Sequence, residues 1–173
     1  MRRIAKFSKI SEMQWAKDWL STYAGTKLAS EDIARKTYDA LILPERATAG
    51  SAGYDFHTPV DIDLMPGESV KFPTGIRCRM EPEFVLLIVP RSSLGFRYSL
   101  QLNNTVGVID SDYYDTDNEG HIFMKLTNAN REGKEVHIKA GQAVAQGIFV
   151  MYGITEDDAA DAKRNGGFGS TDK

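Results

Sequence analysis

One acid-rich segment, GVIDSDY at residues 107–113, combines two carboxylates and a phenol with a short apolar run. Asp110 follows Val108 and Ile109 directly, so we expect its carboxylate at the end of a buried strand, partly dehydrated and rigidly held. A carboxylate in that setting suits a general base that activates water. Taken alone, the segment has an ordinary alternative, because an acidic turn after an apolar run is commonly a solvated one.

Two further runs favour a pocket that binds phosphate. PRSSLG at residues 90–95 offers a guanidinium group and hydroxyls, which bind phosphate oxygens. GGFGST at residues 166–171 offers glycine amides beside one aromatic ring, a composition that suits close approach to an anion. Together with Asp110, these runs predict a pocket for a charged nucleotide.

Length and composition indicate an ordinary globular chain of one domain with an appendage. The 173 residues are 42% hydrophobic and 26% charged, and the net charge is -3. This charge gives no general attraction to nucleic acid or to an anionic membrane, so a phosphate ligand needs local Arg and Lys residues or a metal ion. The single cysteine, Cys78, cannot form an internal disulfide and is expected to be a strand residue. No run reaches the roughly 20 apolar residues of a membrane span, and a cytoplasmic location is predicted.

Residues 1–37 are predicted to form a helical extension. A capping-box signature begins at Ser11, and apolar residues including Trp15 and Trp19 then recur at helical spacing. A second, shorter helix is predicted from Ser30. We expect the two tryptophans to be buried against the main domain or a neighbouring subunit, and a dedicated partner site is the alternative.

From residue 38 onward the pattern changes to short apolar or alternating segments separated by turn residues. Many short strands at intervals of about ten residues predict an all-β, jelly-roll-like barrel over residues 38–154. The last stretch, 155–173, is acidic, then basic, then glycine-rich, and is expected to form a flexible arm. The predicted strands are 38–43, 61–64, 70–72, 76–80, 84–89, 122–126, 136–138 and 143–151.

Five motifs make the chain resemble a known family, the trimeric all-β dUTP diphosphatases (dUTPases), over residues 38–173. The resemblance implies hydrolysis of dUTP to dUMP and pyrophosphate with Mg²⁺ as cofactor, and it leaves the N-terminal helices unexplained. The motifs, in the family's order, are SAGYDF at 51–56, PRSSLG at 90–95, NTVGVIDSDY at 104–113, GQAVAQ at 141–146 and RNGGFGST at 164–171.

The resemblance assigns roles at the phosphate side of the site. It implies that Asp110 is the general base toward the water that attacks the α-phosphorus. It implies that Asp55 anchors Mg²⁺ from the outer sphere, through water, which suits a hard cation that keeps its hydration shell. Arg91 is implied as a guanidinium contact to phosphate. The further phosphate contacts implied are Ser92, Ser93 and Gln146.

The hairpin of the third motif is implied to select the nucleoside. In the family its backbone pairs with the uracil edge, which here points to Gly107 and Val108, and Asn104 resembles the amide side chain that contacts the base. Tyr113 resembles the ring that packs beneath the deoxyribose and excludes a ribose 2′-hydroxyl. Without the resemblance, an ordinary tyrosine at a strand end is the alternative. Fixed polar groups discriminate strongly because a mismatched ligand leaves them unpaired.

The glycine-rich arm is implied to close over the bound nucleotide. Phe168 would stack on the uracil, and in the family the arm comes from a different subunit, so a homotrimer with shared sites is expected. The family pattern has Arg five residues before the aromatic ring, where this chain has Lys163, so Lys163 is the alternative to Arg164. The arm residues implied to clasp the phosphates are Arg164, Gly169, Ser170 and Thr171.

The chain departs from the family pattern after Tyr113. Residues 114–121, YDTDNEGH, replace a shorter turn, and Ala143 stands where the fourth motif usually has Arg. The run DTDNEG imitates the start of a calcium loop, but Leu126 stands where its bidentate Glu should be and no helices flank it, so we predict no EF-hand. A solvated acidic loop is predicted instead, with His121 as an ordinary turn residue.

Two rival functions follow from the same sequence. A dCTP deaminase on this fold would need a Glu in the strand IFMKLTN at 122–128, where Lys125 stands. A nucleotide-gated interaction protein could contact a partner through Trp15, Trp19 and residues 115–120. The presence of every catalytic side-chain type favours the diphosphatase over a pure binder, although a second role could coexist with hydrolysis.

Overall fold

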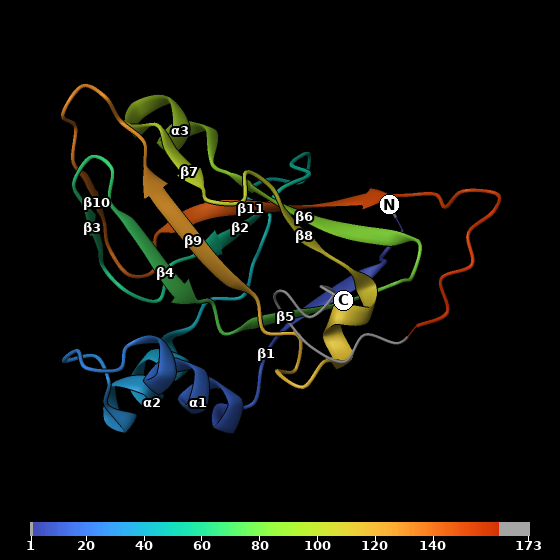
Figure 1. Ribbon diagram of the computed structural model, residues 1–173, viewed down its shortest axis with the longest axis horizontal. Coiled ribbons are helices and arrows are strands. Elements are labelled where there is room, and N and C mark those ends of the chain that lie inside the picture. The colour runs from blue at the N-terminus through green and yellow to red at the C-terminus, as the bar shows by residue number, and fades with distance from the viewer. Residues whose placement is uncertain (1, 163–173) are drawn as a thin grey trace.

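The computed structural model describes residues 2–162, a mostly β structure with two helices packed against one end of the strands (Figure 1). All strand pairs are antiparallel. The N-terminal half contains β1 (Ala5–Lys9), α1 (Glu12–Thr22), α2 (Glu31–Ala40), β2 (Tyr54–His57), β3 (Ile62–Leu64), β4 (Ser69–Pro73), β5 (Ile76–Met80) and β6 (Phe84–Pro90). The C-terminal half contains α3 (Ser92–Tyr98), β7 (Leu100–Leu102), β8 (Gly107–Ile109), the 3-10 helix η1 (Ser111–Asp115), β9 (Phe123–Asn128), β10 (Val136–Ile138) and β11 (Ala143–Met151).

Two larger sheets form the body of the described chain. One has the strand order β2-β11-β6-β8 and the other has the order β4-β9-β7, while β1 pairs with β5 and β10 pairs with β3. Strands β7 and β8 flank a single turn, yet β7 hydrogen-bonds to β9 and β8 to β6. The turn between them, residues 103–106, therefore bridges the two larger sheets. Asn103 and Asn104 of this turn border a cavity.

Helix α1 begins as its sequence predicts. The Oγ atom of Ser11 accepts a hydrogen bond from the backbone N–H of Gln14 at 3.1 Å, which satisfies one of the free amides of the first turn. Trp15 and Trp19 are 1% and 0% exposed, and both indole N–H groups donate to backbone carbonyl oxygens at 2.7 Å. The prediction that the two tryptophans are buried is confirmed, and their contacts lie within the chain.

The first ten residues differ from the prediction of a helix. Ala5–Lys9 forms β1, which pairs with β5 in the register Ala5↔Met80. The reason is aromatic packing, because the ring of Phe7 contacts rings on β2 and β11 at centroid distances of 5.3 to 5.7 Å. The N-terminal segment thus adds a strand to the β structure before the helices begin.

The predicted strand at 38–43 is also wrong. Helix α2 continues to Ala40, and the hydroxyl of Tyr38 donates to the carbonyl oxygen of Ile10 at 2.6 Å. The apolar run was too short here to distinguish a strand from the last turn of an amphipathic helix. The division of the chain at residues 37 and 154 stays a prediction.

The buried apolar residues of the described chain, Trp15 and Trp19 included, form one core cluster. Cys78 is part of it, on β5 as predicted, and burial raises the pKa of its thiol to about 12. Within residues 2–162, no helix is long and apolar enough to cross a membrane.

Candidate active site

Three motif residues meet where β11 lies between β2 and β6. Gln146 on β11 pairs with Asp55 on β2, and its Nε2 atom donates to Asp55 Oδ1 at 3.0 Å. Arg91 follows the end of β6, and its guanidinium Nη2 lies 3.4 Å from Asp55 Oδ2. The side chains of Arg91 and Asp55 are 33% and 13% exposed, so both can still meet a ligand. We call Asp55, Arg91 and Gln146 the phosphate cluster, after the phosphate site that the sequence predicts for them.

Local backbone geometry holds the phosphate cluster in place. The carbonyl oxygen of Arg91 accepts hydrogen bonds from the amides of the first turn of α3, which fixes where that helix begins. Ser92 and Ser93 occupy this first turn and are exposed. A Cβ atom at Gly53 would lie 3.1 Å from Gln146 Cδ, so a glycine leaves room for the amide to reach Asp55.

Arg91 and Asp55 carry opposite charges within the phosphate cluster. The Arg91 guanidinium lies beside the Asp55 carboxylate and offsets its negative charge. A guanidinium is also suited to binding phosphate oxygens. His57 lies two residues after Asp55 on β2, and burial lowers its pKa although the nearby carboxylates Asp55 and Glu45 oppose the shift. The imidazole is therefore neutral at pH 7, and Arg91 is the cation of this cluster.

A separate cavity of about 350 Å³ lies beside the turn that bridges the two sheets. Its walls include Asn104 and Gly107 of the hairpin and Phe123 and Lys125 of β9. A Cβ at Gly107 would lie 3.1 Å from the Cβ of Ile88, so the glycine lets β8 approach β6 closely. The cavity therefore combines apolar walls, hairpin backbone and one amide side chain, which suits a flat heterocycle. Val108 is 58% exposed on the same strand.

Asp110 and Tyr113 lie at the junction between β8 and η1. Asp110 is partly buried, and its carbonyl oxygen accepts from the Tyr113 amide at 3.2 Å. Tyr113 is 4% exposed. Its hydroxyl donates to the carbonyl oxygen of His121 at 2.7 Å and accepts from Asn118 Nδ2 at 2.9 Å. The phenol is thus held by the segment that follows it.

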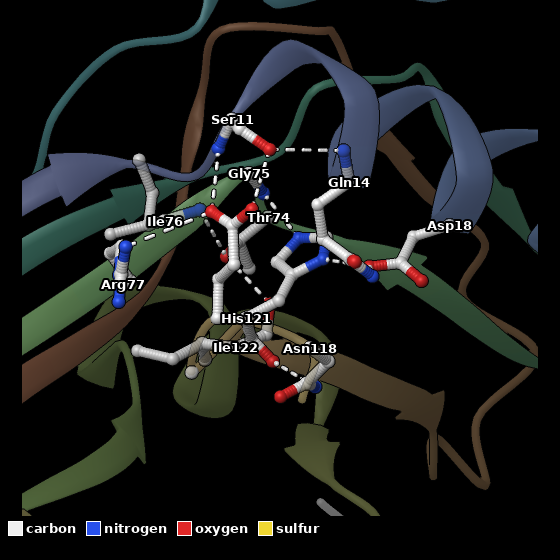
Figure 2. Close-up of polar contacts among 12 residues, drawn as sticks. Ser11, Gln14, Asp18, Thr74, Gly75, Ile76, Arg77, Asn118, His121 and Ile122 are labelled. Atoms are coloured by element: carbon white, nitrogen blue, oxygen red, sulfur yellow. Dashed lines mark hydrogen bonds and ion pairs between the residues drawn. The ribbon is translucent and has the colours of Figure 1, made fainter. Parts of the chain in front are cut away.

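That following segment is not the solvated acidic loop that the sequence predicted. Thr116, Gly120 and His121 are buried, although Asp115 and Asp117 remain exposed. His121 is fully buried rather than an ordinary turn residue, and Figure 2 shows its ring between α1 and the turn before β5. The prediction failed because the segment is buried against α1, which is distant in sequence. No periodic pattern in the segment indicates that contact.

Asp110 and the phosphate cluster lie at opposite ends of β6. The register pairs Ile109 with Leu86, so Asp110 continues toward the start of β6, whereas Arg91 follows its end. At roughly 3.3 Å per strand residue, these positions are about 20 Å apart. Within one chain, Asp110 and Arg91 therefore cannot reach the same phosphorus atom.

The predicted residues of the glycine-rich arm lie outside the described residues. These are Lys163, Arg164, Phe168, Gly169, Ser170 and Thr171.

The fold and the site define a class of protein: a mostly β protein with a carboxylate–guanidinium–amide cluster and a separate cavity beside a hairpin. The comparisons are specific, because the family model described as dUTPase matches residues 39–172. The chain belongs to the dUTPase family.

Relatives and solved structures agree with this membership. The chain is 41% identical over 149 residues to the deoxyuridine 5'-triphosphate nucleotidohydrolase of Lactococcus lactis, covering 84% of this chain and 98% of that protein. The dUTPase structure from Streptococcus mutans is 38% identical with a TM-score of 0.60, covering 68% of this chain and 91% of that one. A mutant dUTPase of phage 80alpha has a TM-score of 0.61 and covers 99% of this chain and 100% of that one. At 17% identity, this last likeness supports the fold alone.

Proposed function

We propose that this chain hydrolyses dUTP to dUMP and pyrophosphate. Membership of the dUTPase family supports this function, as does the identity to relatives named for that reaction. The observation that carries the proposal is the phosphate cluster, in which side chains 91 positions apart in sequence come within hydrogen-bonding distance. A carboxylate, a guanidinium and an amide together suit a metal-bound polyphosphate.

In the proposed reaction, Asp110 takes a proton from a water molecule. The water oxygen forms a bond to the α-phosphorus, and the bond from that phosphorus to the oxygen bridging to the β-phosphate breaks. Pyrophosphate leaves with the bridging oxygen and its electron pair. A positioned general base contributes about 10²- to 10⁴-fold in rate. Arg91, Ser92, Ser93 and Gln146 would hold the phosphate oxygens in line.

The chemistry of the residues fits a hydrated Mg²⁺. In the described part of the chain, no group of three or more His, Cys, Asp or Glu side chains could hold a metal ion. Asp55 offers one carboxylate, which suits contact through water with an ion whose other ligands are water and phosphate oxygens. When bound, the ion would neutralise charge on the triphosphate. Asp55 would orient its water shell.

The nucleoside would occupy the cavity beside the hairpin. Asn104 and the backbone of Gly107 and Val108 are proposed to read the uracil edge, and Tyr113 to pack beneath the deoxyribose. The apolar walls of the cavity and the close approach of β8 to β6 support this placement. A mismatched base would leave the hairpin's polar groups unpaired.

Each complete site would be shared between chains of a homotrimer. The separation of Asp110 and Arg91 along β6 supports sharing, because one chain cannot present both to one phosphorus. In this arrangement the jelly-roll-like barrel of residues 38–154 supplies one face of each of two sites. The arm of residues 155–173 would close a third chain's site through Phe168, with Arg164 or Lys163, Gly169, Ser170 and Thr171 at the phosphates.

The single Cys78 supports a cytoplasmic location.

The test is pyrophosphate release with Mg²⁺ from dUTP, dCTP, dTTP and UTP. We expect release from dUTP alone, reduced by about 10²- to 10⁴-fold in Asp110→Asn. Asp112→Asn, at an exposed carboxylate two residues away, is the matched control and should keep most of the activity. Ammonia release from dCTP would instead indicate a deaminase. Nucleotide binding without release would favour the nucleotide-gated interaction protein.

A further inference from the structure

The buried imidazole of His121 joins three parts of the fold (Figure 2). Its Nδ1 atom lies 2.6 Å from Asp18 Oδ2 on α1, and its Nε2 atom accepts the backbone N–H of Gly75 at 2.8 Å. Its carbonyl oxygen accepts the hydroxyl of Tyr113 at 2.7 Å. One residue of the segment after η1 therefore touches the N-terminal helix, the turn before β5 and the proposed nucleoside side.

The hydrogen bonds define the protonation state of the ring. Because the Gly75 amide can only donate, Nε2 must carry a lone pair, and the single ring proton is on Nδ1 and is donated to Asp18. Burial lowers the pKa of His121 although Asp18 opposes the shift. Burial alone would raise the pKa of Asp18, but hydrogen bonds from His121 and Gln14 outweigh burial and bring that pKa below its ordinary value. The carboxylate is therefore ionised.

A second tie fixes the same segment to the start of α1. The carboxylate of Glu119 accepts the Ser11 amide at 2.8 Å and the Ser11 hydroxyl at 2.5 Å, and Arg77 lies 3.7 Å from it. Gly120 follows with φ +69°, and a Cβ there would lie 2.8 Å from the carbonyl oxygen of Tyr113. The segment can therefore fold back onto Tyr113 only with glycine at this position.

Two aromatic residues of the proposed nucleoside side contact His121. Tyr113 receives its hydroxyl acceptor from the His121 carbonyl. Phe123, which lines the cavity, packs its ring against the imidazole with a centroid distance of 4.5 Å. A second cavity behind Phe123 is lined by Lys71 and by Asp18 of α1, so the helix lies close to this wall. A shift of the imidazole would move both residues.

We propose that His121 is a positioning residue for the nucleoside side of the site, through which Asp18 of helix α1 holds Tyr113 and Phe123 in place. The inference rests on the proposed function, because these two side chains matter to activity only if the cavity receives a deoxyuridine nucleotide. It gives the N-terminal helices, which family membership leaves unexplained, a role in substrate selection.

The experiment compares the full-length chain with Asp18→Ala, which removes the acceptor of the ring proton, and Asp18→Asn, which keeps an acceptor oxygen. Lys17→Ala, at an exposed position on the same helix, is the control. The dissociation constants of dUMP and UMP are measured by calorimetry, and kcat and KM are measured for dUTP. We expect Asp18→Ala to weaken dUMP binding by about 3- to 30-fold, to reduce the preference for dUMP over UMP, and to raise KM more than it lowers kcat. Asp18→Asn should restore most of the preference.

An Asp18→Ala chain that is folded and keeps the wild-type preference for dUMP would overturn the proposal, whatever its melting temperature. Should that variant fail to fold, Glu119→Ala removes the hydrogen bonds between Glu119 and Ser11 at a less buried position. It is judged by the same preference for dUMP over UMP. The two proposals fail differently. A wild-type chain that releases no pyrophosphate from dUTP contradicts the proposed reaction. A wild-type chain that prefers dUMP, with a preference unaffected by these variants, contradicts the positioning role alone.

Discussion

The phosphate cluster and the buried contact between His121 and Asp18, which we call the His121 junction, are both polar, but they are built in different ways. Asp55 and Gln146 face each other because β2 and β11 pair in one register, and the cluster stays partly open to solvent. His121 and Asp18 are joined only by side-chain and tertiary contacts, and the imidazole is fully buried. Sheet register provides the first arrangement at little extra cost, whereas the second must satisfy every buried polar atom. We therefore expect changes in the first to damage chemistry and changes in the second to damage shape.

The largest expected effect tests whether the two ends of β6 serve different chains. Asp110→Asn and Arg91→Ala should each be nearly inactive, and refolding them together should restore activity. Random mixing places an intact Asp110 and an intact Arg91 in the same site in about a quarter of cases, so about a quarter of wild-type activity is expected. Activity is measured as pyrophosphate release after joint refolding. Mixtures as inactive as the separate variants would mean that one chain supplies both groups.

The next effect concerns the charge of the phosphate cluster. Asp55→Asn keeps the shape and an acceptor for Gln146 but removes the negative charge, so the fold should be unchanged. We expect kcat/KM for dUTP to fall by about 10- to 100-fold, the usual loss when a group that orients a metal's ligands is removed. The Mg²⁺ concentration needed for half-maximal activity should rise. An unchanged magnesium dependence, with lower activity, would separate Asp55 from the ion.

The His121 junction should respond in stability. Gly120→Ala places a Cβ 2.7 Å from the Cα of Tyr114 in a positive-φ conformation, so we expect a loss of about 2 to 4 kcal/mol in the free energy of unfolding. Gly133→Ala is the control, because Gly133 also has positive φ but no atom lies within 4 Å of its Cβ position. It should lose only about 1 kcal/mol. Urea denaturation of both variants measures the difference, and equal losses would show that the contact with Tyr114 is unimportant.

The smallest effect is the pH dependence of that stability. Burial lowers the pKa of His121 below its ordinary value of 6.5. The unfolded chain therefore binds a proton that the folded chain resists, so this contribution is complete above pH 6.5 and is lost as the pH falls below it. His121→Asn, which keeps a donor for Asp18, should show a smaller loss between pH 7.5 and pH 5.5. His57 also has a pKa lowered by burial, but it is present in both chains and cancels in the comparison.

Much of the fold could be predicted because its signals are local. The capping box at Ser11 predicted the start of α1, and the segment 76–80 predicted β5, since each depends on neighbouring residues. Motif order suggested that Asp55, Arg91 and Gln146 act together, and the structure places them in contact, although their roles toward the nucleotide stay predictions.

The remaining features depend on partners far away in the sequence. His121 pairs with Asp18 across 103 positions, and neither residue lies in a periodic pattern that points to the other. The strand β1 was missed for the same reason, because its five residues form a strand only beside β5. Patterns among neighbouring residues identify a polar side chain, but they do not show whether a segment distant in sequence will bury it.

The pairing of β1 with β5 also has a consequence for the order in which the protein folds during synthesis. Ala5 pairs with Met80 and Lys9 pairs with Ile76, so β1 has no partner strand until the chain is translated through β5. Contacts between segments far apart in sequence form late, because a long loop must be closed first. Strand β1 is therefore made before its partner and incorporated late, and nascent chains halted before Ile76 should leave it accessible to proteases and chaperones.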